Sequence, residues 1–88
     1  MRFYQECVRV AQSVGTLMTE EQLAAFADTI TAEHRYVLGM WVGNHLLPQN
    51  PYLHEALEAL GLTTAEEKTQ FLITFAQQYW ILFRRNLL

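Results

Sequence analysis

Residues 71–88 read FLITFAQQYWILFRRNLL, and this stretch is the strongest structural signal in the chain. Its apolar side chains recur at i, i+3, i+4 and i+7, which is the spacing of one face of an α-helix. That face comprises Leu72, Phe75, Ala76, Tyr79 and Phe83. Further large apolar side chains lie elsewhere around the same helix: Ile73, Trp80, Leu87 and, in part, Ile81 and Leu88. A helix that is apolar nearly all round is buried on more than one side.

Two arrangements would bury such a helix in a chain of 88 residues. It can be the central helix of the fold, or one of its faces can pack against another chain. Because Trp, Tyr and Arg are enriched among the anchors of protein interfaces, the sequence favours the second arrangement. The candidate anchors on this helix are Tyr79, Trp80, Phe83 and Arg84. On this interpretation, Trp80→Ala weakens self-association or partner binding and leaves the helicity intact.

The longest helix predicted upstream begins at TEEQ, residues 19–22, which has the pattern of a capping box. The apolar residues that follow keep helical phase, and His34 falls in the same stripe. They are Leu23, Phe26, Ala27, Ile30, Val37, Leu38, Trp41 and Val42. The sequence thus predicts one helix over about residues 20–45. A break near Thr29–Thr31 is the main alternative, because Thr is a middling helix former that can also cap a new start.

Four helices account for nearly the whole chain, over about residues 2–14, 20–45, 51–60 and 64–85. Their ends carry the expected residues: a glycine after the first and third helices (Gly15 and Gly61), the start Asn50–Pro51, and Thr63 or Thr64 as the cap of the last. No segment shows the strict alternation of a strand. The predicted fold class is therefore all-α, a compact four-helix domain with short connections, and residues 1–88 form one domain.

The composition favours a protein that buries apolar surface against a partner. Apolar residues make up 51% of the chain, including two Trp, four Tyr and five Phe. This fraction is at or above the roughly 45–50% of ordinary globular chains, whereas a chain this short can build only a thin core. We therefore expect a protein partner or a homo-oligomer, most simply a dimer.

Charge and length exclude several other partners and compartments. The formal charge is −3, from nine acidic and six basic residues, which argues against binding of nucleic acid. The apolar run YWILF, residues 79–83, is far shorter than the roughly 20 residues that span a bilayer, so no membrane partner is predicted. Cys7 has no second cysteine for an internal disulfide, and the N-terminus shows no signal peptide. The predicted compartment is the cytoplasm.

A second candidate site lies in LGMWVGNHLLPQNP, residues 38–51. Gly39 and Gly43 are one helical turn apart, and a glycine inside a helix costs up to about 1 kcal/mol. Either a second helix approaches closely there, or Gly43 helps to end the helix before the two prolines. The candidate binding residues at this helix end are Trp41, Asn44 and His45.

No residue pattern indicates catalysis, a metal or a cofactor. His34, His45 and His54 lack the i, i+4 spacing of a helical zinc site. Cys7 lies in the apolar stripe of the first helix, where a cysteine behaves as a small hydrophobic residue. The two pairs of neighbouring glutamates occupy first helical turns, where the helix dipole explains them: Glu20–Glu21 and Glu66–Glu67. The chain is therefore predicted not to be an enzyme, although a small-molecule or metal-dependent enzyme that uses His34, His45 or Cys7 remains an alternative.

The segments LGMWVGN, YLHEAL and LGL, followed by an acidic helix start, resemble a family of small uncharacterised bacterial proteins. The shared pattern is a Gly-x-Trp-aliphatic-x-Asn helix end, a leucine-rich loop and helix, a glycine stop and an acid-led helix. The matching positions, within residues 34–75, are Gly39, Trp41, Val42, Asn44, Leu53 and Gly61. Members of the family usually carry a basic residue where this chain has Gly43, and their upstream histidine is one position closer to the tryptophan than His34. The family has no established activity, so the resemblance implies no function.

The function predicted from the sequence is that of a small, acidic, non-enzymatic protein-interaction module. An inhibitor of a bacterial or phage defence factor, or a toxin-neutralising immunity protein, fits the size, the charge and the lack of a recognisable active-site motif. The alternative is a structural homodimer or a small subunit of a larger assembly.

Overall fold

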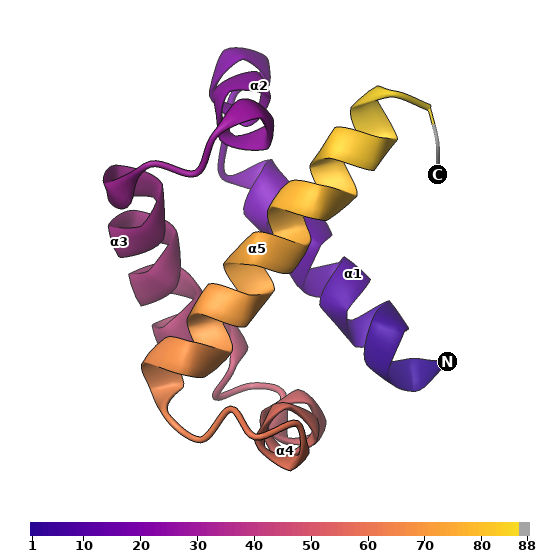
Figure 1. Cartoon of the computed structure of the whole chain (residues 1–88), viewed down its shortest axis with the longest axis vertical. Helices are drawn as coiled ribbons and strands as arrows, with labels where there is room; N and C mark the ends of the chain where they lie inside the picture. Colours follow the sequence, from indigo (N-terminus) through magenta and orange to yellow (C-terminus); the bar gives the residue numbers. More distant parts are fainter. Residues whose placement is uncertain (87–88) are drawn as a thin grey trace.

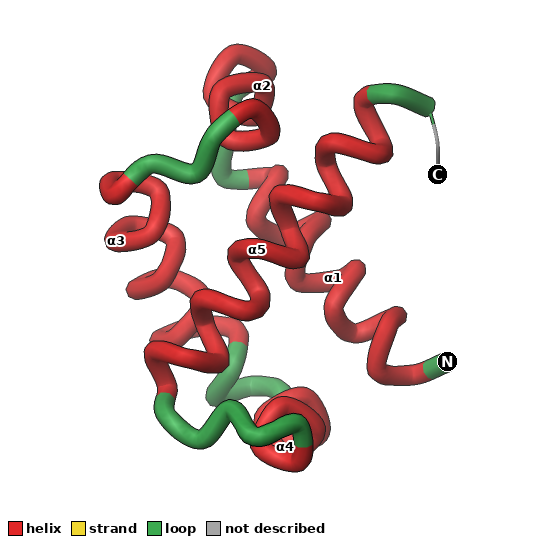
Figure 2. Tube along the Cα trace, viewed as in Figure 1, coloured by secondary structure: helices red, strands yellow, loops and turns green. Residues whose placement is uncertain are grey.

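A computed structural model describes residues 1–86, which form five α-helices and one short π-helix, with no strand. The elements are α1 (Arg2–Thr16), α2 (Glu20–Asp28), α3 (Ala32–Trp41), η1 (Val42–Leu46), α4 (Pro51–Ala59) and α5 (Ala65–Arg84). Figure 1 shows α5 crossing α1, with α2, α3 and α4 around the pair. Short loops connect the helices (Figure 2). The all-α prediction is confirmed, the count of four helices is wrong, and the predicted apolar positions Leu87 and Leu88 lie outside the described residues.

The single helix predicted over residues 20–45 is wrong, and the alternative break at Thr29–Thr31 is confirmed. Thr29 has extended backbone angles (φ −150°, ψ 129°), which end α2. Thr31 then caps α3: its hydroxyl accepts from the His34 amide at 3.1 Å, and its own amide donates to His34 Nδ1 at 3.1 Å. This is a capping box with histidine in the position that usually holds Glu or Gln. Because the break resets the helical phase, the apolar stripe does not continue from α2 into α3.

α5 is the central helix of the fold, which is the arrangement that the sequence disfavoured. It contacts α1, α2, α3, η1 and α4, and it buries Leu72, Ile73 and Ala76 completely. The core opposite these residues comes mainly from α1 and α4: Cys7, Val10, Ala11, Val14, Leu53 and Leu57. Although α5 has 20 residues, no helix in the described part of the chain is long and apolar enough to cross a membrane.

Most of the predicted helix ends are confirmed because each rests on a local hydrogen bond. Asn50 accepts from the Leu53 amide at 3.1 Å and starts α4. Gly61 (φ +94°) ends α4 in a Schellman motif, in which the amide of Leu62 donates to Leu57 O at 3.1 Å. Thr64 rather than Thr63 caps α5 in a capping box with Glu67. The Thr64 backbone amide, above all, holds the pKa of the Glu67 carboxyl below its ordinary value.

The predicted helix end at Gly15 is wrong, since α1 continues to Thr16 and Gly15 keeps a negative φ. A glycine is needed there for packing instead. A Cβ at Gly15 would overlap Cζ2 of the Trp80 indole and lie 2.8 Å from its Cε2. The close approach of α5 to α1 therefore explains this residue, and the sequence of α1 alone cannot show it.

Candidate partner-binding surfaces

The outer side of α3 is the most exposed apolar surface on a single helix of the described chain. Leu38 is the one buried side chain of α3, whereas 69% of Tyr36, 54% of Val37 and 50% of Met40 is exposed. These three residues are neighbours on the helix surface, and we call them the α3 ridge. The sequence places Val37 in the same apolar stripe as Leu38, but α3 buries the Leu38 side of the helix, and Val37, about 100° further round, is exposed. Exposed apolar side chains gathered in this way mark interaction sites.

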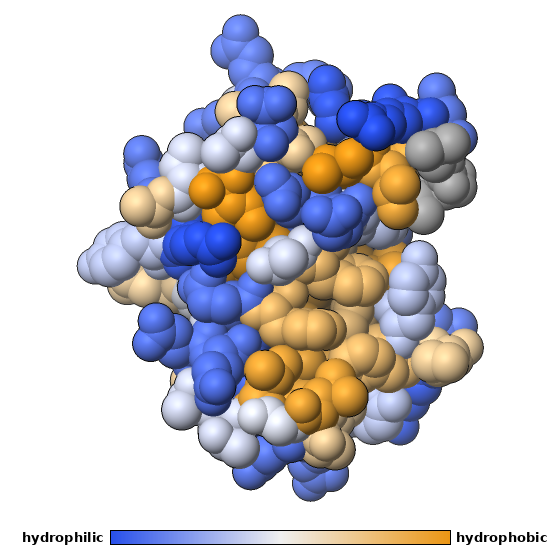
Figure 3. All heavy atoms as spheres, in the orientation of Figure 1, coloured by the Kyte–Doolittle hydropathy of each residue, from blue (hydrophilic) through white to orange (hydrophobic). Residues whose placement is uncertain are grey.

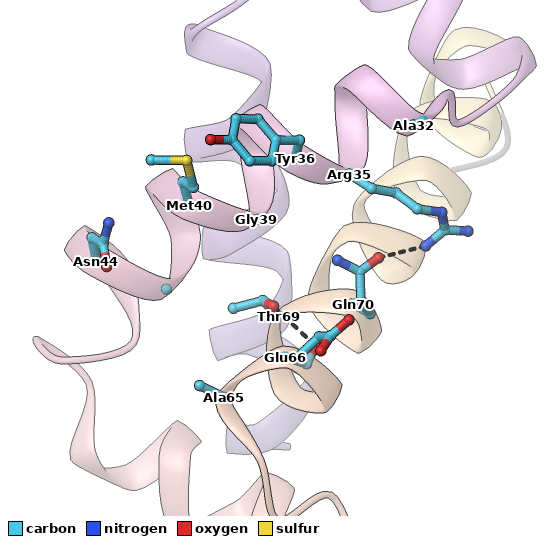
Figure 4. Close-up of a pocket in the computed structure, with 11 residues that line it drawn as sticks. Ala32, Arg35, Tyr36, Gly39, Met40, Asn44, Ala65, Glu66, Thr69 and Gln70 are labelled. Carbon is cyan, nitrogen blue, oxygen red and sulfur yellow. Dashed lines mark hydrogen bonds between the residues drawn. The ribbon is translucent and has the colours of Figure 1, made fainter.

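An open cavity of about 730 Å³ lies beside the ridge, between α3–η1 and the first turns of α5. We call it the α3–α5 groove. In Figure 4, Tyr36, Met40 and Asn44 line one side, and Glu66 and Gln70 line the other. The Arg35 guanidinium donates to the side-chain oxygen of Gln70 across the groove. The α3–η1 side of the groove therefore mixes apolar and polar side chains, whereas the α5 side is mainly polar.

Gly39 and Gly43 both line this groove, but only one of them is required to be a glycine by packing within the chain. A Cβ at Gly43 would lie 3.2 Å from Cγ2 of Thr69, so α5 approaches closely there. A Cβ at Gly39 would make only ordinary contacts, at 3.5 Å from Nε2 of Gln70 and 3.7 Å from Cδ1 of Ile73. Alanine thus fits at Gly39 and would be the better helix former by up to about 1 kcal/mol. Packing within the chain explains Gly43 but not Gly39.

The helix end predicted as a binding site contains the π-helix η1. Its wider turn is closed by the Leu47 amide, which donates to Val42 O at 3.0 Å. Single π-helical turns inside helices occur frequently at functional sites. Asn44 is exposed in the α3–α5 groove. Trp41 stacks on exposed His45, with ring centroids 6.1 Å apart and planes 24° apart.

A second cavity, of about 560 Å³, lies on the other flank of α3, against α2 and the end of α1. We call it the α2–α3 groove. Val37 and Trp41 line it from α3, and Leu17, which is 46% exposed, lines it from α1. The ridge therefore stands between two grooves, and the candidate residues Trp41 and Asn44 point into different ones.

The candidate residues on the last helix lie in a different part of the molecule and mostly make internal contacts. Trp80 Nε1 donates to Ala11 O at 2.8 Å, and the indole packs on Gly15. Arg84 Nη1 lies 3.4 Å from Oε1 of Glu20, at the start of α2. The structure therefore does not bring the last-helix residues next to Trp41, Asn44 and His45.

Phe83 and Tyr79 lie at one end of an aromatic row along the seam of α1 and α5. Phe83 is 51% exposed and stacks on Tyr79, and at the other end of the seam Tyr4 packs edge-on against Phe75. Figure 3 shows apolar side chains gathered on the face where α5 and α1 cross. We call this row, which comprises Phe3, Tyr4, Phe71, Phe75, Tyr79 and Phe83, the aromatic seam.

The residues weighed for metal binding or catalysis are held by other contacts. His34 caps α3, His45 lies against Trp41, and Lys68 Nζ lies 3.2 Å from Nε2 of His54. Within residues 1–86, no three His, Cys, Asp or Glu side chains are close enough together to hold a metal ion. Cys7 is fully buried, and desolvation, with a smaller contribution from the charge of Glu6, raises the pKa of its thiol to about 11.

The ordinary pKa of a cysteine thiol is 9.0, so the raised pKa of Cys7 makes the free energy of unfolding depend on pH above about pH 9. Between about pH 9 and pH 11 the unfolded thiol ionises and the folded thiol does not, so the free energy of unfolding falls as pH rises. Urea unfolding at pH 8 and pH 10.5 should show this loss, of order 1–2 kcal/mol, beyond any loss in Cys7→Ala. Equal losses in the two proteins would contradict it, because the other titrating groups are shared.

The sequence pointed to the helix end but missed the ridge. Tyr36 and Met40 were not singled out, and the signal that could have found them is their position on the helix, opposite Leu38 and Val42, where large apolar side chains are unexpected. The side chains at 36, 37 and 40 lie opposite buried Leu38 and Val42 on the helix. Comparisons of the chain with protein-family models, with curated proteins and with solved structures found no match.

Proposed function

We propose that this chain is a non-enzymatic protein-interaction module that binds another protein through the α3 ridge and the α3–α5 groove. The observation that carries the proposal is the exposure of Tyr36, Val37 and Met40 on one helix face. Gly39 supports the proposal. Alanine would fit at this position and stabilise the helix, so packing within the chain does not require a glycine there, whereas the close approach of a partner would. An inhibitor of a defence factor, or an immunity protein that neutralises a toxin in the cytoplasm, is the biological role we favour for such a module.

Photo-crosslinking tests this proposal with a matched control position. A benzophenone side chain in place of Tyr36 should yield one discrete cross-linked protein species in cells of the native source. The same probe in place of Leu60, which is 60% exposed at the end of α4, should yield none. Met40→Ser should abolish the product from position 36, and Leu60→Ser should not. Equal cross-linking from positions 36 and 60, or none from either, would contradict the proposal.

A structural homodimer is a second candidate function, and the aromatic seam favours it. Aromatic side chains contribute much of the energy of interfaces, and Phe83 and Tyr4 are each about half exposed on this seam. If the seam pairs two copies, the chain is a dimer by light scattering and Tyr4→Ser/Phe83→Ser is a monomer. A monomer at every concentration of the unmodified chain would eliminate this candidate.

A further inference from the structure

The hydrogen bonds at the start of α3 fix the protonation of the His34 imidazole. Its Nδ1 lies 3.1 Å from the backbone nitrogen of Thr31, in the capping box that begins the helix. A backbone N–H can only donate, so Nδ1 is the acceptor and carries no proton. The proton of the neutral ring is therefore on Nε2. The Phe26 ring packs against the imidazole in this position, with ring centroids 5.3 Å apart and planes at 86°.

Protonation of His34 would remove the acceptor from this capping box. Both nitrogens of a histidinium ring carry a proton, so two donors would face each other where Thr31 N now meets Nδ1. The added cation would also lie in the first turn of α3, at the positive end of the helix dipole. A glutamate or glutamine, which capping boxes usually have at this position, keeps its acceptor in mild acid.

We propose that the start of α3 is a pH-sensitive switch, in which neutral His34 holds the first helical turn and protonated His34 releases it. An unperturbed histidine ionises near pH 6.5. Because the folded chain needs the neutral ring and the unfolded chain does not, the free energy of unfolding falls as pH falls through about 6.5. The released turn leads directly into Tyr36 and Val37, the first two residues of the α3 ridge. The switch is a property of the fold and does not depend on the proposed function.

The charges around His34 leave the direction of this effect unchanged. The charged side chain that shares the α2–α3 groove with His34 is the exposed Glu33. Glu33 is adjacent to His34 on the helix, and adjacent residues do not face each other, so its attraction for a histidinium offsets only part of the loss. Asp28 at the end of α2 lines a different cavity, and its carboxylate accepts from the Thr29 hydroxyl at 3.4 Å. The side chains that α2 and the end of α1 contribute to the groove are uncharged: Leu17, Met18, Gln22 and Ala25.

His45, at the other end of the same helical segment, provides a matched contrast. Its Nδ1 lies 3.3 Å from Trp41 O, and a carbonyl oxygen can only accept, so Nδ1 of His45 is the donor in this contact. Protonation of His45 keeps that donor. Acid should therefore weaken the contact of His34 and leave the contact of His45 in place.

Thermal unfolding at pH 7.5 and pH 5.0 tests the switch in the unmodified chain, His34→Gln and His45→Gln. Glutamine at position 34 can complete the capping box but does not titrate. The fall in melting temperature between the two pH values should be smaller in His34→Gln by roughly 4–8 °C, which corresponds to one lost capping interaction in a domain of this size. His45→Gln should show the full fall. The carboxylates and His54 titrate in all three proteins, so their contribution cancels in the comparison.

Nuclear magnetic resonance of the unmodified chain tests the same switch without a substitution. Long-range proton–nitrogen spectra at pH 7.5 should show the Nε2–H tautomer of His34, and the Thr31 amide should lose protection from hydrogen exchange at pH 5.0. The Nδ1–H tautomer at pH 7.5, or unchanged protection of Thr31, would overturn the proposal. So would an equal fall in melting temperature in the unmodified chain and His34→Gln. None of these results bears on the cross-link from position 36, so the proposed function fails or stands by its own test.

Discussion

Trp80→Ala is expected to lower the free energy of unfolding by about 3 kcal/mol, near the lower end of the values for truncating a core aromatic residue. Trp80 is partly buried, but its indole fills the space over Gly15 and donates to Ala11 O at 2.8 Å. Removing it leaves a gap between α1 and α5, the two most extensively paired helices. For a domain of this size the melting temperature should fall by roughly 10–20 °C, measured by circular dichroism.

A double-mutant cycle with Gly15→Ala distinguishes this packing from a general loss of stability. With Trp80 present, the added methyl group overlaps the indole, and Gly15→Ala should cost about 1–3 kcal/mol. In the Trp80→Ala background the same change should be neutral or stabilise the helix by up to about 1 kcal/mol. The cost of Gly15→Ala should therefore disappear or reverse once the indole is removed. Two destabilisations that simply add would show that the indole does not occupy this space.

This expectation replaces the one drawn from the sequence, in which Trp80→Ala left the helices intact and weakened only association. A loss of binding in that variant would now reflect unfolding. Phe83, which is 51% exposed on the same helix, is the residue whose truncation can report on association with little loss of packing. Tests of the aromatic seam should therefore avoid Trp80.

Lys68→Ala is expected to destabilise the chain, whereas Lys68→Met is not. Only 2% of Lys68 is exposed, and its Nζ lies 3.2 Å from Nε2 of His54 and 3.4 Å from Oε2 of Glu58. Lys68→Ala removes the buried aliphatic stem and should lower the free energy of unfolding by about 2–3 kcal/mol. Lys68→Met keeps the stem and removes the buried charge, so it should leave the free energy of unfolding unchanged or raise it by about 1 kcal/mol.

The contrast between the two variants follows from the exposure of the partners. About half of the His54 and Glu58 side chains is exposed, so water can solvate them once the ammonium group is gone. Urea unfolding at neutral pH measures both variants. If Lys68→Met destabilises the chain as much as Lys68→Ala, the polar contacts of Lys68 rather than its stem hold α4 against α5.

Some of the candidate site could be predicted and some could not. Asn44 and His45 were singled out because they follow a tryptophan at a helix end, and both are exposed beside the ridge. Val37 was not, because a continuous helix through Thr29–Thr31 places it in the apolar stripe, and Tyr36 and Met40 were not, because an apolar residue outside a stripe is not by itself a signal. Which of these side chains stay exposed depends on how α3 packs against its neighbours, which the sequence pattern does not give.

The sequence by itself determined the all-α class and most helix ends, since a cap or stop depends on residues within about four positions of one another. The capping boxes at Thr19 and Thr64 and the turn at Gly61 are such local features. Only the tertiary structure decided that Gly15 makes room for Trp80 and that the outer side of α3 faces solvent. Those outcomes depend on side chains far apart in the sequence, and packing against them sets which face of a helix is buried.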